Sequence, residues 1–324
     1  MIDIRKLQST YWWKAQEKFE SLIKNENRLL ELTMQITDRC NMNCEKCNKT
    51  NFTSEDMKTD DVLRIISQAC DLGLRHIHFT GGEPTIHEDF IEMIKYCKDR
   101  GLRVDASSNG MFDRLTAEKI CEAGLDSINI SWDFIDKKPQ SLDFNELKNQ
   151  VFINHMVMPS NYRELPSFLE YVANHYPNVL DIQLMPPRGG ATLFTKKEID
   201  DYNNNIAKEA FVRTVGKYQM VDAKVLLVLA DKEAVEGIYH KKIDWPCHRA
   251  RSELRVGTKG FTTCTYLYRD GHVLCGLDKS TKEAWDLCKG MYKASSPPIP
   301  GMCDKSCSPE VCYFNYFVEE GLKN

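Results

Sequence analysis

Residues 32–47 read LTMQITDRCNMNCEKC, a short β-rich run followed at once by a cysteine-rich loop. Cys40, Cys44 and Cys47 have the spacing Cys-x3-Cys-x2-Cys. Three thiolates on one short loop can bind three irons of a cubane cluster and leave the fourth iron open. A structural zinc site usually needs a fourth ligand, and the nearest candidate, Cys70, lies within a predicted helix. The loop therefore predicts a metal centre with an open coordination position, which is typical of a site that does chemistry.

The chain around this loop alternates between short β-rich runs and amphipathic helical stretches from residue 32 to residue 187. Strands are predicted over residues 32–37, 76–80, 102–106, 127–131, 151–157 and 179–185. Helices are predicted over residues 60–72, 88–99, 116–122, 165–175 and 196–215, with residues 136–150 helical in part. Repeated strand-then-helix units imply a parallel sheet with right-handed crossovers. The pattern predicts an α/β fold, a partial (β/α)6 TIM-like barrel with its ligand site at the C-terminal strand ends.

The second predicted strand ends in GGEP at residues 81–84. A cysteine loop after the first strand, together with this tetrapeptide after the second, resembles the radical S-adenosylmethionine (SAM) superfamily over about residues 32–187. The resemblance implies a [4Fe–4S] cluster held by the three cysteines, with SAM bound at the open iron. Reductive cleavage of SAM would release a 5′-deoxyadenosyl radical that abstracts hydrogen from a substrate C–H bond. A flavodoxin- or ferredoxin-type reductant would supply the electron.

The resemblance also implies which residues contact SAM. The glycines would let the backbone approach the amino group, and Glu83 would supply a countercharge. The residues implied to bind SAM lie at strand ends and are Gly81, Gly82, Glu83, Pro84, Ser107, Asn109, Ser131 and Met185. The superfamily usually has an aromatic residue directly before the third cysteine, whereas this chain has Lys46.

The composition limits the class of protein. The 324 residues carry 43 Lys and Arg against 47 Asp and Glu, a formal charge of −4. A near-neutral chain without a basic stripe argues against nucleic-acid binding. The longest apolar stretch, residues 225–230, is too short to cross a bilayer, and the N-terminus lacks the apolar core of a secretory signal. A cytoplasmic protein without nucleic-acid or membrane partners is expected.

The thirteen cysteines are an odd number, so they cannot all pair within the chain. In a reducing cytosol, thiols more often bind metal or lie in the core. Cys70, Cys97 and Cys121 fall on predicted helices and are expected to be inert core thiols. Seven others lie between Cys247 and Cys312, where turn residues become dense. Such a loop-rich region needs a metal to hold it together.

Within that region, Cys247, the strand-like residues 254–256, Gly260 and Cys264 predict a metal-clipped hairpin. A second possible frame runs from Cys264 to Cys275. The pattern resembles the SPASM or twitch extension of radical enzymes, which implies an auxiliary [4Fe–4S] cluster. A structural zinc or a second auxiliary cluster is the alternative. The implied ligands are Cys247, Cys264 and two of Cys303, Cys307 and Cys312. The predicted domains are an N-terminal helical extension (1–31), the barrel (32–240) and the auxiliary-cluster domain (241–324).

Two late cysteines have no ligand role in this scheme. Cys275 and Cys288 are candidate catalytic residues, because a thiol can return a hydrogen atom to a substrate radical. One of them could instead be a second-cluster ligand, and both could be ordinary thiols.

The predicted function is radical SAM chemistry that oxidises, epimerises or cross-links a small molecule or a peptide. The GTP cyclase of molybdopterin synthesis is similar in size. However, Ala250 stands where that enzyme has a second cysteine of its auxiliary site, and the chain ends without its Gly-Gly tail. A zinc-stapled scaffold or an iron–sulfur electron carrier, neither of them catalytic, is the alternative function.

Overall fold

The computed structural model describes residues 28–44, 47, 53–143, 147, 150–185, 194–207, 209–210, 253–263, 268 and 271–292. The chain folds as two compact units. Within the described ranges, the first unit holds residues 28–106 and 253–292, and the second unit holds residues 107–210. No helix in these ranges is long and apolar enough to span a membrane.

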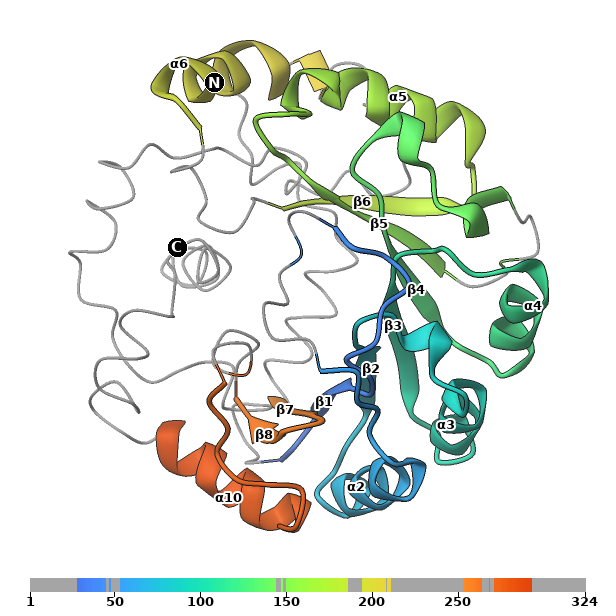
Figure 1. Cartoon of the computed structure of the whole chain (residues 1–324), viewed down its shortest axis with the longest axis vertical. Coiled ribbons are helices and arrows are strands. Elements are labelled where there is room, and N and C mark those ends of the chain that lie inside the picture. Colours follow the sequence, from blue (N-terminus) through green and yellow to red (C-terminus); the bar gives the residue numbers. More distant parts are fainter. Residues whose placement is uncertain are drawn as a thin grey trace. The chain divides into compact units, whose positions relative to one another are not determined.

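The first unit is built on strands that pair in the order β3-β2-β1-β7-β8, all parallel except the β7–β8 pair. These strands are β1 (Glu31–Gln35), β2 (His76–Thr80), β3 (Arg103–Ser108), β7 (Glu253–Gly257) and β8 (Gly260–Thr262). The helical segments are α2 (Thr59–Asp71), the 3-10 turn η2 (Pro84–Ile86), α3 (Phe90–Lys98) and α10 (Thr281–Tyr292). Figure 1 shows α2 between α3 and α10. β1 therefore lies between β2 and a strand from the far end of the chain.

Side chains alternate between the two faces of this sheet. Leu32 and Met34 of β1 and Ile77 and Phe79 of β2 are fully buried. The Phe79 ring meets the Phe90 ring of α3 edge-on at 5.8 Å, so this apolar face is the one that the helices cover. The residues between them face the other way and form what we call the inner face, which carries Glu31, Thr33, Gln35, His76, His78, Asp105, Glu253 and Arg255.

The second unit carries strands that pair in the parallel order β6-β5-β4. These strands are β4 (Ser127–Ser131), β5 (Gln150–Met156) and β6 (Val179–Met185). The helices are α4 (Arg114–Glu122), α5 (Leu165–His175), α6 (Lys196–Asp201) and the π-helical η7 (Tyr202–Ile206), with 3-10 turns η3 (Ile135–Lys137), η4 (Gln140–Asp143) and η5 (Tyr162–Glu164). Trp132, directly after β4, is 1% exposed and packs edge-on against Phe168 of α5 and against Tyr176. These aromatic rings fix α5 against the strands.

The predicted order of strands and helices is confirmed in the described residues, and the fold class is the predicted α/β fold with a partial (β/α)6 TIM-like barrel. The largest difference follows β4. Residues 136–150 were predicted to be helical in part. Those that the structure describes before β5 form the short 3-10 turns η3 and η4 and do not form an α-helix. Pro139 explains this, because a proline disfavours the helical conformation of the residue before it and removes a backbone donor. The predicted hairpin is present as β7 and β8.

Candidate functional site

The cysteine loop, residues 37–57, leaves the C-terminal end of β1 and is closed at its base by backbone pairing. Thr37 and Asp56 form an antiparallel bridge. On either side of it, Asp38 N–H donates to Glu55 O at 2.8 Å and Met57 N–H donates to Ile36 O at 2.8 Å. The two ends of the loop are therefore held like a short strand pair, which satisfies their buried backbone groups.

The three predicted ligand thiols lie beyond this base. Cys40 is half-buried, Cys44 and Cys47 are exposed, and none of them is in a disulfide. The Met42 N–H points at Cys40 Sγ over 3.4 Å. Cys47 N–H donates to Cys44 O at 3.0 Å. Three accessible thiols on a closed loop fit the donor set of a cluster with one open iron. Among the residues that the structure describes, no three His, Cys, Asp or Glu side chains are already gathered around a metal position.

The GGEP turn after β2 is joined directly to the cysteine loop. Gly82 N–H donates to Thr37 O at 2.7 Å, and Glu83 N–H donates to Arg39 O at 2.8 Å. A Cβ on Gly82 would lie 1.8 Å from Arg39 O, and one on Gly81 would lie 2.8 Å from Thr37 O. The sequence suggested that these glycines admit a ligand. The structure gives them an additional task, because only glycine lets the two backbones approach this closely.

Glu83, the predicted countercharge, is a fully buried carboxylate. Its Oε1 accepts hydrogen bonds from Thr85 Oγ1 at 2.7 Å and from Thr85 N–H at 3.2 Å. The carboxylate thus caps η2, which begins at Pro84, and its orientation is fixed by the turn that follows it.

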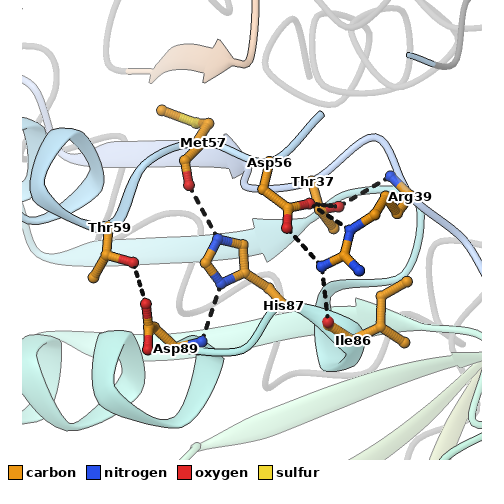
Figure 2. A network of polar contacts seen from close by, with 8 residues as sticks. All are labelled: Thr37, Arg39, Asp56, Met57, Thr59, Ile86, His87 and Asp89. Carbon is orange, nitrogen blue, oxygen red and sulfur yellow. Dashed lines mark hydrogen bonds and ion pairs between the residues drawn. The ribbon is translucent and has the colours of Figure 1, made fainter. Parts of the chain in front are cut away.

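The sequence analysis did not identify Arg39, which holds the two sides of the cysteine loop together (Figure 2). Arg39 forms a two-point ion pair with Asp56, with Nε to Oδ1 at 2.9 Å and Nη2 to Oδ2 at 2.5 Å, and Nη2 also donates to Ile86 O at 3.1 Å. Burial acts to raise the pKa of Asp56, but hydrogen bonds from Arg39 and Thr37 lower it below its usual value. Arg39 therefore connects both sides of the cysteine loop to the turn after GGEP. Its position directly before Cys40 was the only signal in the sequence.

A buried histidine continues this network toward the helices (Figure 2). His87 Nε2 lies 3.0 Å from Met57 O, and Asp89 N–H donates to His87 Nδ1 at 3.2 Å. In this arrangement Nε2 donates to Met57 O and Nδ1 accepts from Asp89 N–H. Thr59 at the start of α2 donates to the Asp89 carboxylate before α3. The starts of both helices are thereby tied to the returning end of the cysteine loop.

Four predicted SAM contacts lie at strand ends and belong to the second unit. Ser107 is half-buried at the end of β3, and Ser131 is exposed at the end of β4. Asn109 Oδ1 accepts a hydrogen bond from Met111 N–H at 2.8 Å, which makes a local turn directly after β3. Met185 is the last residue of β6, and its side chain lies outside the described atoms.

Of the cysteines from Cys247 onward, the structure describes Cys275 and Cys288. Cys275 is half-buried and pairs across from Phe261 of β8, where Phe261 N–H donates to Cys275 O at 2.9 Å. Burial raises the pKa of the Cys275 thiol, and the charges of Asp278 and Glu283 add to this effect. Cys288 of α10 is fully buried, with Sγ 3.7 Å from Glu253 O. The proposed auxiliary ligands lie outside the described residues, and they are Cys247, Cys264, Cys303, Cys307 and Cys312.

The inner face carries a cluster of charged side chains that no sequence motif indicated. Asp105 of β3 accepts hydrogen bonds from two imidazoles of β2, from His76 Nε2 and from His78 Nδ1, the latter at 2.8 Å. His76 Nδ1 lies 3.6 Å from the Glu31 carboxylate. Burial acts against the charge of His76, but the hydrogen bond and charge of Asp105, with that of Glu31, raise its pKa above the usual value. Burial also acts against the charge of Asp105, but the two histidines lower its pKa well below the usual value.

Because of this cluster, we expect the contribution of Asp105 to the stability of the folded protein to change with pH. The lowered pKa of Asp105 contributes stability above its unfolded value near 3.8, and that contribution is lost as the pH falls toward the folded value. The raised pKa of His76 contributes stability below its unfolded value near 6.5, and that contribution is lost as the pH rises through the folded value. Asp105→Asn is therefore expected to cost about 1–3 kcal/mol near pH 5.5 and clearly less near pH 8.5. Anaerobic urea unfolding at both pH values measures this, and an equal cost at both would contradict the assignment of charge to His76.

The structure thus places a three-cysteine loop at the C-terminal end of the first strand of a parallel α/β sheet. Residues 34–151 match the model of the Radical SAM superfamily. This part of the chain, which carries the cysteine loop and the GGEP turn, is thus similar to the radical SAM superfamily, whose members use a [4Fe–4S] cluster and SAM.

Curated relatives match over part of their length. A probable GTP 3′,8-cyclase of Pyrococcus abyssi is 36% identical over 33% of this chain and 36% of its own. The PqqA peptide cyclase of Methylorubrum populi is 27% identical over 43% of this chain and 41% of its own. The chain thus spans about a third to a half of the length of these relatives.

Solved structures share the fold over most of the chain. SuiB of Streptococcus suis bound to its precursor peptide SuiA has a TM-score of 0.61 at 16% identity, and the match covers 87% of this chain and 71% of SuiB. Native anSMEcpe with bound AdoMet has a TM-score of 0.61 at 14% identity, covering 87% and 88%. At such low identities the similarity establishes the fold alone.

Proposed function

We propose that this protein is a radical SAM enzyme that cleaves SAM reductively and removes a hydrogen atom from a substrate C–H bond. The observation that best supports this proposal is the backbone pairing of the cysteine loop with the GGEP turn, through Gly82 to Thr37 and Glu83 to Arg39. This pairing brings three thiols that are not in disulfides and a buried carboxylate onto adjacent loops. Thiolates suit a [4Fe–4S] cluster, and a carboxylate suits the amino group of SAM.

In this proposal Cys40, Cys44 and Cys47 hold the cluster as thiolates. The bound cluster supplies the electron that splits SAM into methionine and a 5′-deoxyadenosyl radical. Glu83 receives the amino group, and the two hydrogen bonds from Thr85 orient its carboxylate before SAM binds. Because Glu83 is fully buried, its attraction to a cationic amine is stronger than in water. The remaining proposed SAM contacts are Gly81, Gly82, Pro84, Ser107, Asn109, Ser131 and Met185.

The C-terminal region is proposed to hold an auxiliary [4Fe–4S] cluster. Its ligands would be Cys247, Cys264 and two of Cys303, Cys307 and Cys312, in a domain of residues 241–324 that follows the barrel of residues 32–240. Residues 1–31 would be a helical extension. A structural zinc at the same cysteines is the competing assignment, because sulfur ligation suits both metals.

The substrate is proposed to be a peptide or a small molecule that is oxidised, epimerised or cross-linked. A peptide is supported by two similar proteins, a PqqA peptide cyclase and SuiB, which has been solved bound to a precursor peptide. For epimerisation, Cys275 is the better placed of the two proposed hydrogen donors, because Cys288 is fully buried. A flavodoxin- or ferredoxin-type protein would reduce the cluster, and the protein would work in the cytoplasm.

Cofactor loading and SAM cleavage test this function together. Anaerobically reconstituted protein with SAM and dithionite is expected to release 5′-deoxyadenosine, whether or not the substrate is known. Iron analysis is expected to give about four irons per chain for one cluster and about eight for two. Fully loaded protein that releases no 5′-deoxyadenosine would leave only an electron carrier, and zinc in place of iron would leave a scaffold.

A further inference from the structure

Asp38, two residues before Cys40, is a buried carboxylate that gathers donors from three segments. It is 2% exposed. Gln35 Nε2 at the end of β1 donates to Oδ1 at 2.5 Å, and Thr53 Oγ1 in the returning half of the cysteine loop donates to Oδ2 at 2.6 Å. The third donor is Thr258 Oγ1, at 2.9 Å from Oδ2 and 220 residues away in the sequence. A buried carboxylate needs such donors, because each lost donor leaves charge without compensation.

Thr258 lies in the turn between β7 and β8, and this turn is fixed from its other side by Tyr268. Lys259 N–H donates to the Tyr268 hydroxyl oxygen at 3.0 Å, and the Tyr268 and Thr258 hydroxyls are 3.1 Å apart. The Thr258 hydroxyl donates its proton to the Asp38 carboxylate, so the Tyr268 hydroxyl donates its own proton to Thr258 Oγ1. The result is one directed chain, from Lys259 N–H through Tyr268 and Thr258 to the Asp38 carboxylate. Bonds in such a chain polarise and strengthen one another.

The turn also packs closely against the end of β1. A Cβ on Gly257 would lie 2.4 Å from the Tyr268 hydroxyl and 3.1 Å from Gln35 Cβ. Since Gln35 is itself a donor to Asp38, the turn contacts two members of the same hydrogen-bonded group. Little room is left for the turn to move without disturbing the start of the cysteine loop.

We propose that Thr258 and Asp38 are positioning residues that couple the β7–β8 turn to the cysteine loop. The C-terminal hairpin thereby sets how firmly the loop that carries Cys40, Cys44 and Cys47 is held. This inference rests on the proposed function only in taking these cysteines as cluster ligands. It adds that the hairpin, which the chain reaches 220 residues later, is part of the support of that site.

Thr258→Val removes one hydroxyl at nearly constant shape and tests this coupling. In hydrogen-exchange measurements on the full, anaerobically reconstituted chain, the Asp38 and Met57 amides at the loop base are expected to exchange about tenfold faster, the equivalent of one charge-assisted hydrogen bond. The fraction of reduced cluster whose electron paramagnetic resonance spectrum changes on addition of SAM is expected to fall. Thr258→Ser keeps the hydroxyl and is expected to restore both readouts.

Thr281→Val is the matched control. Thr281 also links a C-terminal element to an N-terminal one in the same unit, with Oγ1 3.0 Å from Gln68 Oε1 of α2, and its hydrogen bonds among the described residues go to α2. It is expected to lower thermal stability while leaving the two amides and the spectral change as in the parent. Unchanged amides in Thr258→Val, or equal effects of both variants, would overturn the coupling. If the parent protein holds no iron at the three cysteines, the proposed function is wrong. The hydrogen-exchange result would still test the coupling between the β7–β8 turn and the cysteine loop.

Discussion

Replacing Gly82 by alanine is expected to lower SAM cleavage by about 100-fold or more, because misplacement of a reacting group by about 1 Å can have that effect. The new Cβ would lie 1.8 Å from Arg39 O, 2.4 Å from Arg39 C and 2.8 Å from Asp38 O. All three are backbone atoms, so no side-chain rotation can relieve the clash. The GGEP turn and the cysteine loop would have to separate, which breaks the bonds from Gly82 N–H to Thr37 O and from Glu83 N–H to Arg39 O.

The same change is expected to cost about 1–3 kcal/mol of unfolding free energy, as other overpacked sites do. Gly290→Ala is the control, since a Cβ there would meet nothing within 4 Å and the residue lies in α10. That variant is expected to be as active as the parent and slightly more stable, because alanine favours a helix over glycine. The measurements are 5′-deoxyadenosine release and urea unfolding under anaerobic conditions. A Gly82→Ala protein with normal SAM cleavage would show that the close backbone contact does not position the site.

Cys44→Ala is expected to reduce 5′-deoxyadenosine formation to background and to lower the iron content by about four atoms per chain. Cys44 is exposed and outside the packed core, so its removal is expected to change stability by less than about 0.5 kcal/mol. The loss of 5′-deoxyadenosine formation would then result from the missing cluster ligand and not from unfolding of the protein. Three thiolates hold the cluster in this proposal, and no other thiol is within the loop to replace one of them.

Cys121→Ala, on α4 in the second unit, is the control for the loss of a thiol as such. It is expected to keep both iron and activity. Iron and acid-labile sulfide are measured beside product release, so that loading and catalysis are judged separately. If Cys44→Ala retained full iron and cleaved SAM, the proposed cluster position would be wrong.

The sequence predicted the features that depend on local pattern. The β-rich run at residues 32–37 predicts a strand, and the positions of Cys40 and Gly82 after successive strands predict that their loops meet at one edge. Both predictions hold in the structure. They could be made because parallel strands in a barrel place their C-terminal ends together.

Contacts between distant residues could not be predicted in this way. Arg39 and Asp56 look like ordinary surface charges in the sequence, and Thr258 lies in a turn with no motif of its own. Their partners follow from the register of β1 against β2 and β7, which a single sequence does not reveal. The same holds for Asp105, whose two histidine partners depend on the pairing of β2 with β3.

The pairing of β1 with both β2 and β7 also bears on how the protein is made. The β2 side of β1 can form early in synthesis, but its other edge stays open until the chain 220 residues farther on has been translated. At about 5–20 residues per second, that interval lasts roughly 10–45 s. Throughout it, Asp38 lacks the Thr258 hydroxyl and an unpaired strand edge is available to other chains. During this interval the nascent chain carries the cysteine loop without the hydrogen bond that the β7–β8 turn later supplies.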